Sequence, residues 1–334
     1  MRKRLTVFTL GLTLFLSAAV VFANGQSEGG KAEGGKSGQP TIALLILGME
    51  SRYPPVYVAK FSEVVKNAGM NFFLFNAKFD AQLQAQQMDD AIAMKPAMIV
   101  IFALDSQGLA PAIKKAYEAG IPVFMCNNPP VKESEQYTVA YAGPNNYLEG
   151  QLVGEIIHEK LGGKGAKIVM IEGVAGQDAQ IKRAQGAMDK LRDLGSDVKL
   201  IARQCADWRT DKAVQVMQDF ITRYGKEISG VYGQDDNLAL GAVIALQESG
   251  ADPSGIPIIG INGCKEALQA VNEGKMYCTI LQSPIKEAAL EANMAVEMVK
   301  KGFTRDSKWN PYWNFMETPK VFKSNVSQYL PGDW

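Results

Sequence analysis

Side chains suited to binding hydroxyl groups recur where apolar segments of this sequence end. Asn127 and Asn128 follow one apolar run, Asn262 follows another, and Gln282 follows a third. A side-chain amide donates and accepts hydrogen bonds, so it matches a hydroxyl group, which does both. Trp208 follows a further run and offers a flat apolar face. The candidate ligand-binding residues at these run ends are Glu50, Ser51, Asp105, Asn127, Asn128, Trp208, Asp235, Asn262 and Gln282.

The same positions have a second interpretation, because Ser, Asp and Asn also cap helix N-termini. Asp105, Asp236 and Ser283 fit capping and ligand binding equally well. Asp235 is expected to combine a helix cap with a ligand acceptor. Trp208 is either a core residue or a stacking surface, and we favour stacking because aromatic rings meet ligands in clefts.

Catalytic chemistry is not indicated. The only histidine is His158, so the common Ser-His and Cys-His arrangements lack a base unless it supplies one. The cysteines, Cys126, Cys205, Cys264 and Cys278, are widely spaced and form no C-x-x-C pair. We therefore expect no enzyme, no metal and no cofactor. The thiols are interpreted as small buried apolar groups, although an exported protein could oxidise a pair such as Cys264 and Cys278.

The elements that position these residues alternate in type along the chain. From residue 40, short continuous apolar runs alternate with longer amphipathic runs, and the pattern restarts near residues 142–146. Buried strands between helices indicate a parallel sheet covered on both faces. The sequence therefore predicts an α/β fold with two doubly wound, Rossmann-like lobes. Ligands bind at the carboxyl ends of the strands in such sheets, where the candidate residues lie.

The N-terminus resembles an export signal. Basic residues 2–4 precede an apolar run over residues 5–22, and small residues surround position 23. We interpret residues 1–23 as a cleaved signal peptide and predict a periplasmic location, with a retained membrane anchor as the alternative. Residues 24–39 are almost wholly Gly, Ser, Lys, Glu and Gln, which predicts a flexible linker.

Composition narrows the partners. The chain has 334 residues, and 35 Lys and Arg balance 35 Asp and Glu. A net charge of zero gives no electrostatic reason to expect nucleic acid as a partner.

Three segments carry a resemblance to a known family. Residues 173–176 (GVAG), 231–242 (VYGQDDNLALGA) and 270–275 (AVNEGK) resemble the ribose-binding-protein-like, type I periplasmic binding proteins, relatives of the lac repressor core. The likeness covers residues 41–301. It implies two lobes joined by a hinge, formed by residues 40–142 with 283–303 and by residues 143–282 with 304–334.

The resemblance also implies site residues. Polar and aromatic positions after the first strand match Glu50, Ser51 and Tyr53, and Asp178 at the start of the helix after GVAG is added to the predicted site. The Asp-Arg pair of ribose binders matches Asn127-Asn128, the signature Asn matches Asp235, and a later Asp matches Asn262. An Arg that holds sugar matches Ile181, with Arg183 taken as scaffold. The lobe-crossing Gln is kept as Gln282.

These departures move the expected ligand away from ribose. Arg and Asp are strong, charge-assisted partners of hydroxyls, and neutral amides replace several of them. We expect the ligand to be another sugar or a polyol, with a less hydroxylated or cationic ligand as the alternative. The family implies delivery to an ABC transporter permease by a monomer. Presentation to a chemoreceptor is the alternative role.

Overall fold

The computed structural model describes residues 31–32 and 38–334. The predicted signal peptide lies outside the described residues, as does most of the predicted linker. Within that linker, Lys31–Ala32 forms strand β1 and pairs antiparallel with β3. These two residues therefore do not belong to a flexible linker. They form backbone hydrogen bonds with β3, whose outer edge has unpaired N–H and C=O groups.

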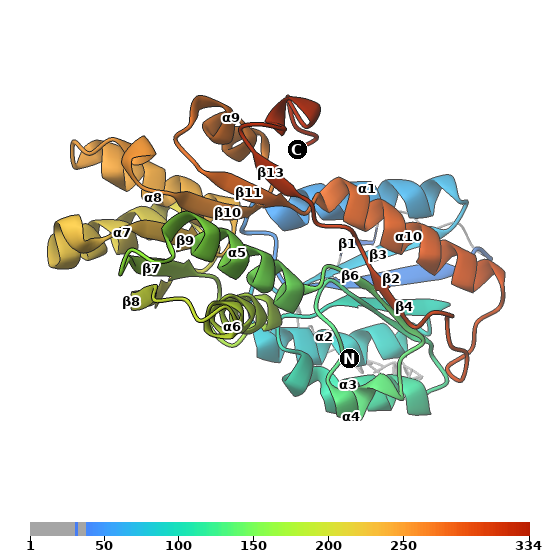
Figure 1. The fold of residues 1–334 in the computed structure, drawn as a ribbon. Helices are drawn as coiled ribbons and strands as arrows, with labels where there is room; N and C mark the ends of the chain where they lie inside the picture. Colours follow the sequence, from blue (N-terminus) through green and yellow to red (C-terminus); the bar gives the residue numbers. More distant parts are fainter. Residues whose placement is uncertain (1–30, 33–37) are drawn as a thin grey trace, which may run out of the picture.

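The first lobe is built on a parallel sheet with strand order β3-β2-β4-β5-β6 (Figure 1). This is a doubly wound order, in which the chain moves to one side of β2 and then to the other. Strands β2, β4, β5 and β6 are almost wholly buried, which explains their continuous apolar runs, whereas β3 is only partly buried. Their bounds are Thr41–Ile46 (β2), Asn71–Asn76 (β3), Met98–Phe102 (β4), Val123–Cys126 (β5) and Ala140–Gly143 (β6).

Helices cover both faces of this sheet. Helices α1 and α10 lie side by side over one face, while α2 and α3 cover the other (Figure 1). Alternate residues of β2 separate into the two layers, with Leu44 in one and Leu45 in the other. The helices are Tyr53–Asn67 (α1), Ala81–Ala93 (α2), Ser106–Glu118 (α3), the short Lys132–Glu135 (α4) and Pro284–Lys300 (α10).

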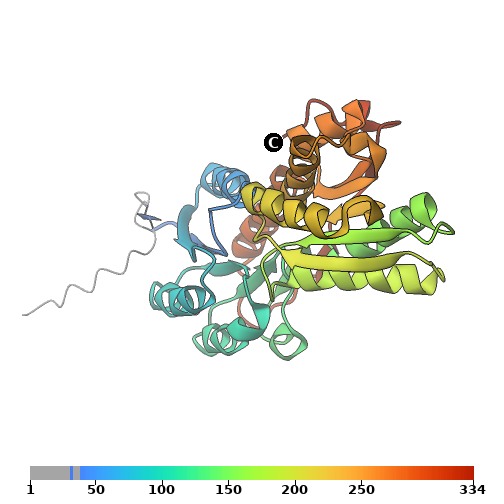
Figure 2. The ribbon, with the colours of Figure 1, turned by 90° about the vertical axis from the view of Figure 1, so that its left-hand side faces the viewer.

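The second lobe repeats the arrangement with the parallel order β8-β7-β9-β10-β11. Helices α5 and α6 cover one face, and α7, α8 and α9 cover the other (Figure 2). The strands are Lys167–Glu172 (β7), Lys199–Cys205 (β8), Gly230–Gly233 (β9), Ile258–Asn262 (β10) and Cys278–Leu281 (β11). The helices are Asn146–Leu161 (α5), Asp178–Asp193 (α6), Thr210–Tyr224 (α7), Asp236–Glu248 (α8) and Lys265–Glu273 (α9).

The C-terminal tail corrects the predicted lobe composition. Residues 304–334 were assigned to the second lobe, but Trp313–Phe315 (β12) pairs with β6 in the first sheet. Only then does the tail cross over, and Lys320–Phe322 (β13) pairs antiparallel with β11. Each lobe had an open sheet edge at this point, and the tail supplies one short strand to each.

Two further observations bear on the predictions. In the described part of the chain, no helix combines the length and apolarity needed to cross a bilayer. All four cysteines are free thiols, and only Cys205 is partly exposed.

Candidate ligand-binding site

The loops that follow the parallel strands of the two sheets face each other and enclose one cavity. Both lobes contribute side chains, and the lobes touch across it, where Arg52 of the first lobe forms a two-oxygen ion pair with Glu266 of the second at 2.8 Å. The described conformation is therefore closed. The cavity is lined by Leu47, Ser51, Tyr53, Pro54, Phe102, Asn127, Gln177, Ala179, Arg183, Trp208, Asp235, Asn262 and Gln282.

Seven of the eleven predicted site residues line this cavity: Ser51, Tyr53, Asn127, Trp208, Asp235, Asn262 and Gln282. Two of them hold unusual backbone conformations, with φ of 58° at Asn127 and 121° at Asn262. Asn tolerates positive φ better than most residues. Each of these amides therefore sits at a sharp turn where its strand ends, Asn127 directly after β5 and Asn262 as the last residue of β10.

The other four predicted residues do not line the cavity. Glu50 is exposed and accepts a hydrogen bond from the backbone N–H of Met49 at 2.7 Å. Asp105 caps helix α3 by accepting from Gln107 N–H at 3.0 Å, so its capping interpretation holds. Asp178 accepts instead from the amide of Asn146 at 3.1 Å.

Asn128 is buried beneath the cavity wall. Its amide nitrogen donates to the carbonyl of Ala103 at 2.6 Å, which ties the loop after β5 to the end of β4. It therefore braces the site from behind without facing the cavity. Its neighbour Asn127 faces the cavity from the same turn.

Arg183 is the lining residue that the sequence interpretation underrated. It projects from α6 into the cavity wall and is 4% exposed, whereas Ile181, the position matched to a sugar-holding Arg, is 45% exposed. Arg183 Nε donates to Glu149 at 3.0 Å, Nη1 donates to the carbonyl of Gln234 at 2.8 Å, and Nη2 donates to Gln282 Oε1 at 2.5 Å. It links α5, β9 and the lobe crossing at the cavity.

Asp235 caps a helix and also lines the cavity. One carboxylate oxygen caps α8 by accepting from Leu238 N–H at 2.9 Å, and the other accepts from the amide of Asn237 at 2.9 Å. The carboxylate also lines the cavity. Burial raises its pKa to about 6, because water no longer solvates the charged form.

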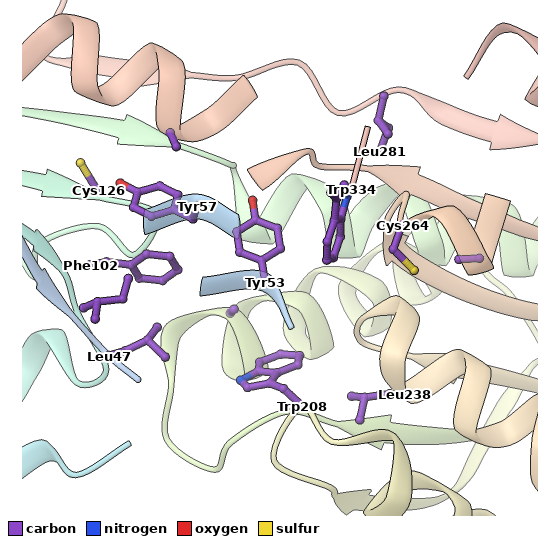
Figure 3. Close-up of a cluster of buried hydrophobic side chains, with 14 of the residues drawn as sticks. Leu47, Tyr53, Tyr57, Phe102, Cys126, Trp208, Leu238, Cys264, Leu281 and Trp334 are labelled. Carbon is purple, nitrogen blue, oxygen red and sulfur yellow. The ribbon is translucent and has the colours of Figure 1, made fainter. Parts of the chain in front are cut away.

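Trp208 forms one wall of the cavity. Its indole N–H donates to Gln177 Oε1 at 2.6 Å, and the ring lies 5.9 Å from the guanidinium carbon of Arg183. Figure 3 shows the ring facing the region of Tyr53 from the opposite lobe. At 8% exposure the ring is part of the core and part of the cavity, so both interpretations of Trp208 describe it.

A buried carboxyl group behind the cavity organises three of its residues. Glu287 on α10 accepts from Asn127 Nδ2 at 2.7 Å, from Gln282 Nε2 at 3.0 Å and from the hydroxyl of Tyr53. One turn later, Glu291 accepts from the hydroxyl of Tyr57. Burial raises the pKa of both carboxyl groups, that of Glu291 well above its ordinary value.

The sequence analysis missed Glu149, Glu287 and Glu291, all fully buried. A signal existed for the last two. They are spaced i, i+4 on a helix among apolar residues such as Ala288, Ala292 and Ala295, and a carboxylate at a buried helical position requires a specific partner.

Metal-ligating side chains do not gather in the described part of the chain. Among residues 31–32 and 38–334, no group of three or more His, Cys, Asp and Glu side chains could hold a metal ion. His158 sits in the last turn of α5, outside the cavity lining.

Known proteins share this architecture. Residues 42–302 match the periplasmic binding protein domain. The chain is 32% identical to the xylitol-binding protein of Mycolicibacterium smegmatis over 255 residues, which cover 75% of this chain and 68% of that protein. It is 28% identical to the ribose import binding protein RbsB of Escherichia coli over 263 residues, or 78% of this chain and 85% of that one.

Among solved structures, one similar protein is an ABC transporter periplasmic solute binding protein from Actinobacillus succinogenes with bound D-allose. The two superpose with a TM-score of 0.75 at 26% identity, over 87% of this chain and 100% of the other. With its two doubly wound lobes and shared cavity, the chain belongs to the periplasmic binding protein family, in its ribose-binding-protein-like type I branch.

Proposed function

We propose that this protein captures a sugar or polyol outside the cytoplasm and delivers it to an ABC importer. The observation that carries the proposal is the composition of the cavity wall. Amides from Asn127, Asn262 and Gln282 and the Asp235 carboxylate surround a space flanked by the rings of Tyr53 and Trp208. Amides and carboxylates match hydroxyl groups, and aromatic faces cover the C–H surfaces of a sugar.

The mechanism follows from the closed conformation. The lining residues are buried, with Asn127 5%, Asn262 4% and Asp235 3% exposed, so a ligand enters only when the lobes separate. It then bonds to one lobe and draws the other closed by rotation about the crossing segments. Gln282 lies in one of these segments and bonds to both lobes, through Tyr53 and through Arg183.

The relatives support the rest of the proposal. One relative is named for xylitol binding and another for ribose import, and they match 75% and 78% of this chain. These names and the export-signal pattern support our proposal of a periplasmic location and of docking on a permease. The family consists of binding proteins, which supports a role in binding for this chain.

Thermal-shift screening followed by calorimetry tests the proposal. The purified protein is measured against D-ribose, xylitol, D-fructose, D-allose and myo-inositol. At least one of these ligands is expected to bind with a micromolar or lower Kd. If none binds and a nucleoside or an amino acid does, the proposed ligand class is wrong.

A further inference from the structure

Charge is distributed very unevenly around the cavity. Six carboxylic side chains are buried in the described part of the chain, and Arg183 is the only basic side chain buried there. Four of these carboxyl groups stand in or directly behind the cavity wall, at Glu149, Asp235, Glu287 and Glu291.

Arg183 has little left to offer a negatively charged ligand. A guanidinium has five N–H donors. Glu149 takes one from Nε at 3.0 Å and one from Nη2 at 2.9 Å, while Gln282 and the carbonyl of Gln234 take two more. The fork that would hold a carboxylate or phosphate through two parallel bonds is therefore already used by the protein.

The hydrogen-bonding capacity of Asp235, unlike that of Arg183, is only partly used by the protein. Its two hydrogen-bond partners are neutral donors, Leu238 N–H and the Asn237 amide, and none of the ion pairs among the described residues includes it. A carboxylate can accept about four hydrogen bonds. Acceptor capacity therefore remains on the cavity side, on a carboxylate that no direct ion pair neutralises, although Arg183 interacts with it at longer range.

We infer that the cavity selects its ligand by charge, through Asp235: it binds neutral and ammonium-bearing sugars or polyols and rejects sugar acids and sugar phosphates. This inference rests on the proposed function and narrows its ligand class. An anion in the closed cavity loses its hydration, finds no free cation and lies beside a carboxylate. An ammonium group loses hydration too, but Asp235 supplies a charge-assisted acceptor in return.

Matched ligands of one shape test the inference. We measure xylitol against D-xylonate, and D-glucose against D-glucosamine and D-glucuronate, at pH 8 by calorimetry. Each acid is expected to bind about 100-fold more weakly than its neutral parent, and glucosamine at least as tightly as glucose. An acid that binds within about threefold of its parent overturns the inference.

Two substitutions then assign the effect to Asp235. Asp235→Asn keeps a capping residue at α8 and is expected to reduce the penalty of the acid at least tenfold. Asp105→Asn is the matched control, because it changes the same residue type at the N-cap of α3, outside the cavity. An unchanged penalty in Asp235→Asn overturns the assignment. Asp235→Ser, which also preserves the cap, serves if the Asn variant does not fold.

The experiments distinguish failure of the proposed function from failure of the charge selection. If no sugar or polyol binds, the proposed function is wrong. The charge selection is then measured by thermal shift against size-matched libraries of small primary amines and small carboxylic acids. Stabilisation by amines and not by acids supports the inference, and stabilisation by acids contradicts it.

Discussion

Trp334, the last residue of the chain, packs edge-on against Tyr53, with 5.4 Å between ring centroids and 81° between ring planes (Figure 3). The Trp334 carbonyl accepts from Lys265 N–H at 3.0 Å, which anchors it to α9 of the second lobe. The neighbouring Asp333 accepts from the hydroxyl of Ser283, the N-cap of α10, at 2.7 Å. Tyr53 belongs to the first lobe and lines the cavity. The C-terminus therefore braces the closed conformation.

Replacing Trp334 with Ala is expected to favour the open form. An aromatic edge-to-face pair contributes about 0.5–1.5 kcal/mol beyond its burial. Opening the lobes breaks this contact, so its loss lowers the closed population and weakens ligand binding about three- to tenfold. Calorimetry gives the Kd, and small-angle scattering of the unliganded protein gives the change in radius of gyration. Trp313→Ala is the control, since Trp313 packs on Tyr141 within the first lobe. Equal weakening in both variants would contradict a specific role for Trp334.

Glu287 is expected to govern affinity through the residues that it holds. Its carboxyl group accepts hydrogen bonds from Tyr53, Asn127 and Gln282. Glu287→Gln replaces one acceptor oxygen with a donor, so at least one of these side chains loses its partner, at a cost of about 1–3 kcal/mol. We expect ligand affinity to fall by about tenfold or more.

The matched control for Glu287→Gln is Glu291→Gln. Glu291 is equally buried on the same helix, but it bonds to the hydroxyl of Tyr57 and the backbone of Asn127. Both variants are expected to lose stability in denaturant titrations, while only Glu287→Gln strongly weakens binding. If affinity falls equally in both, Glu287 has no special positioning role.

The sequence predicted the strand-end residues well for a simple reason. Asn127 and Gln282 follow β5 and β11, Asn262 ends β10, and the carboxyl ends of parallel strands share one edge of a sheet. Asp105 follows β4 in the same way but turns back to cap α3. Which way a side chain points after a strand depends on the local turn, and the position of a residue in the sequence does not determine it.

Helix-borne residues were harder to predict. Ile181 and Arg183 are two positions apart, and two positions rotate a helix by about 200°, so only one of them can face the cavity. Tyr53 and Tyr57 on α1 meet Glu287 and Glu291 on α10 as two matching i, i+4 pairs. Each pair is visible in the sequence, but more than 200 residues separate the helices, and only the fold brings them together.

Stability is expected to increase as the pH falls from 8 to 5.5, in part because of Asp236. Burial raises the pKa of Asp236 to about 7, whereas an Asp in an unfolded chain titrates near ~3.9. The folded protein therefore binds this proton more tightly than the unfolded chain. Its contribution is complete below about pH 4 and is lost as the pH rises through about 7, which is about 2 kcal/mol between pH 5.5 and 8.

Urea denaturation at the two pH values measures this contribution. Asp236→Asn is expected to flatten the pH dependence by roughly that amount, even though the variant is less stable at both pH values. It loses stability because the carboxylate accepts from Gly263 N–H, Cys264 N–H and the Thr279 hydroxyl. Asp105→Asn should leave the slope as it is in the wild-type protein. An unaltered slope in Asp236→Asn would show that other groups carry the pH dependence.

Gly173→Ala is expected to damage the cavity by displacing Trp208. A Cβ at Gly173, directly after β7, would lie 1.9 Å from Trp208 Cζ2, far inside van der Waals contact. The indole must move, and it then loses its hydrogen bond to Gln177 and its place in the cavity wall. We expect a stability loss of about 1–3 kcal/mol and binding at least about tenfold weaker.

Gly255→Ala makes the matched comparison for Gly173→Ala, because a Cβ at Gly255 meets no atom within 4 Å. Calorimetry and tryptophan fluorescence on both variants separate a local displacement of the indole from a general effect of adding a methyl group. A Gly173→Ala protein that binds ligand within about threefold of wild type would mean that the Trp208 ring does not form part of the binding surface. The wall opposite Tyr53 would then have to come from Arg183 and Asp235, which line the same side of the cavity.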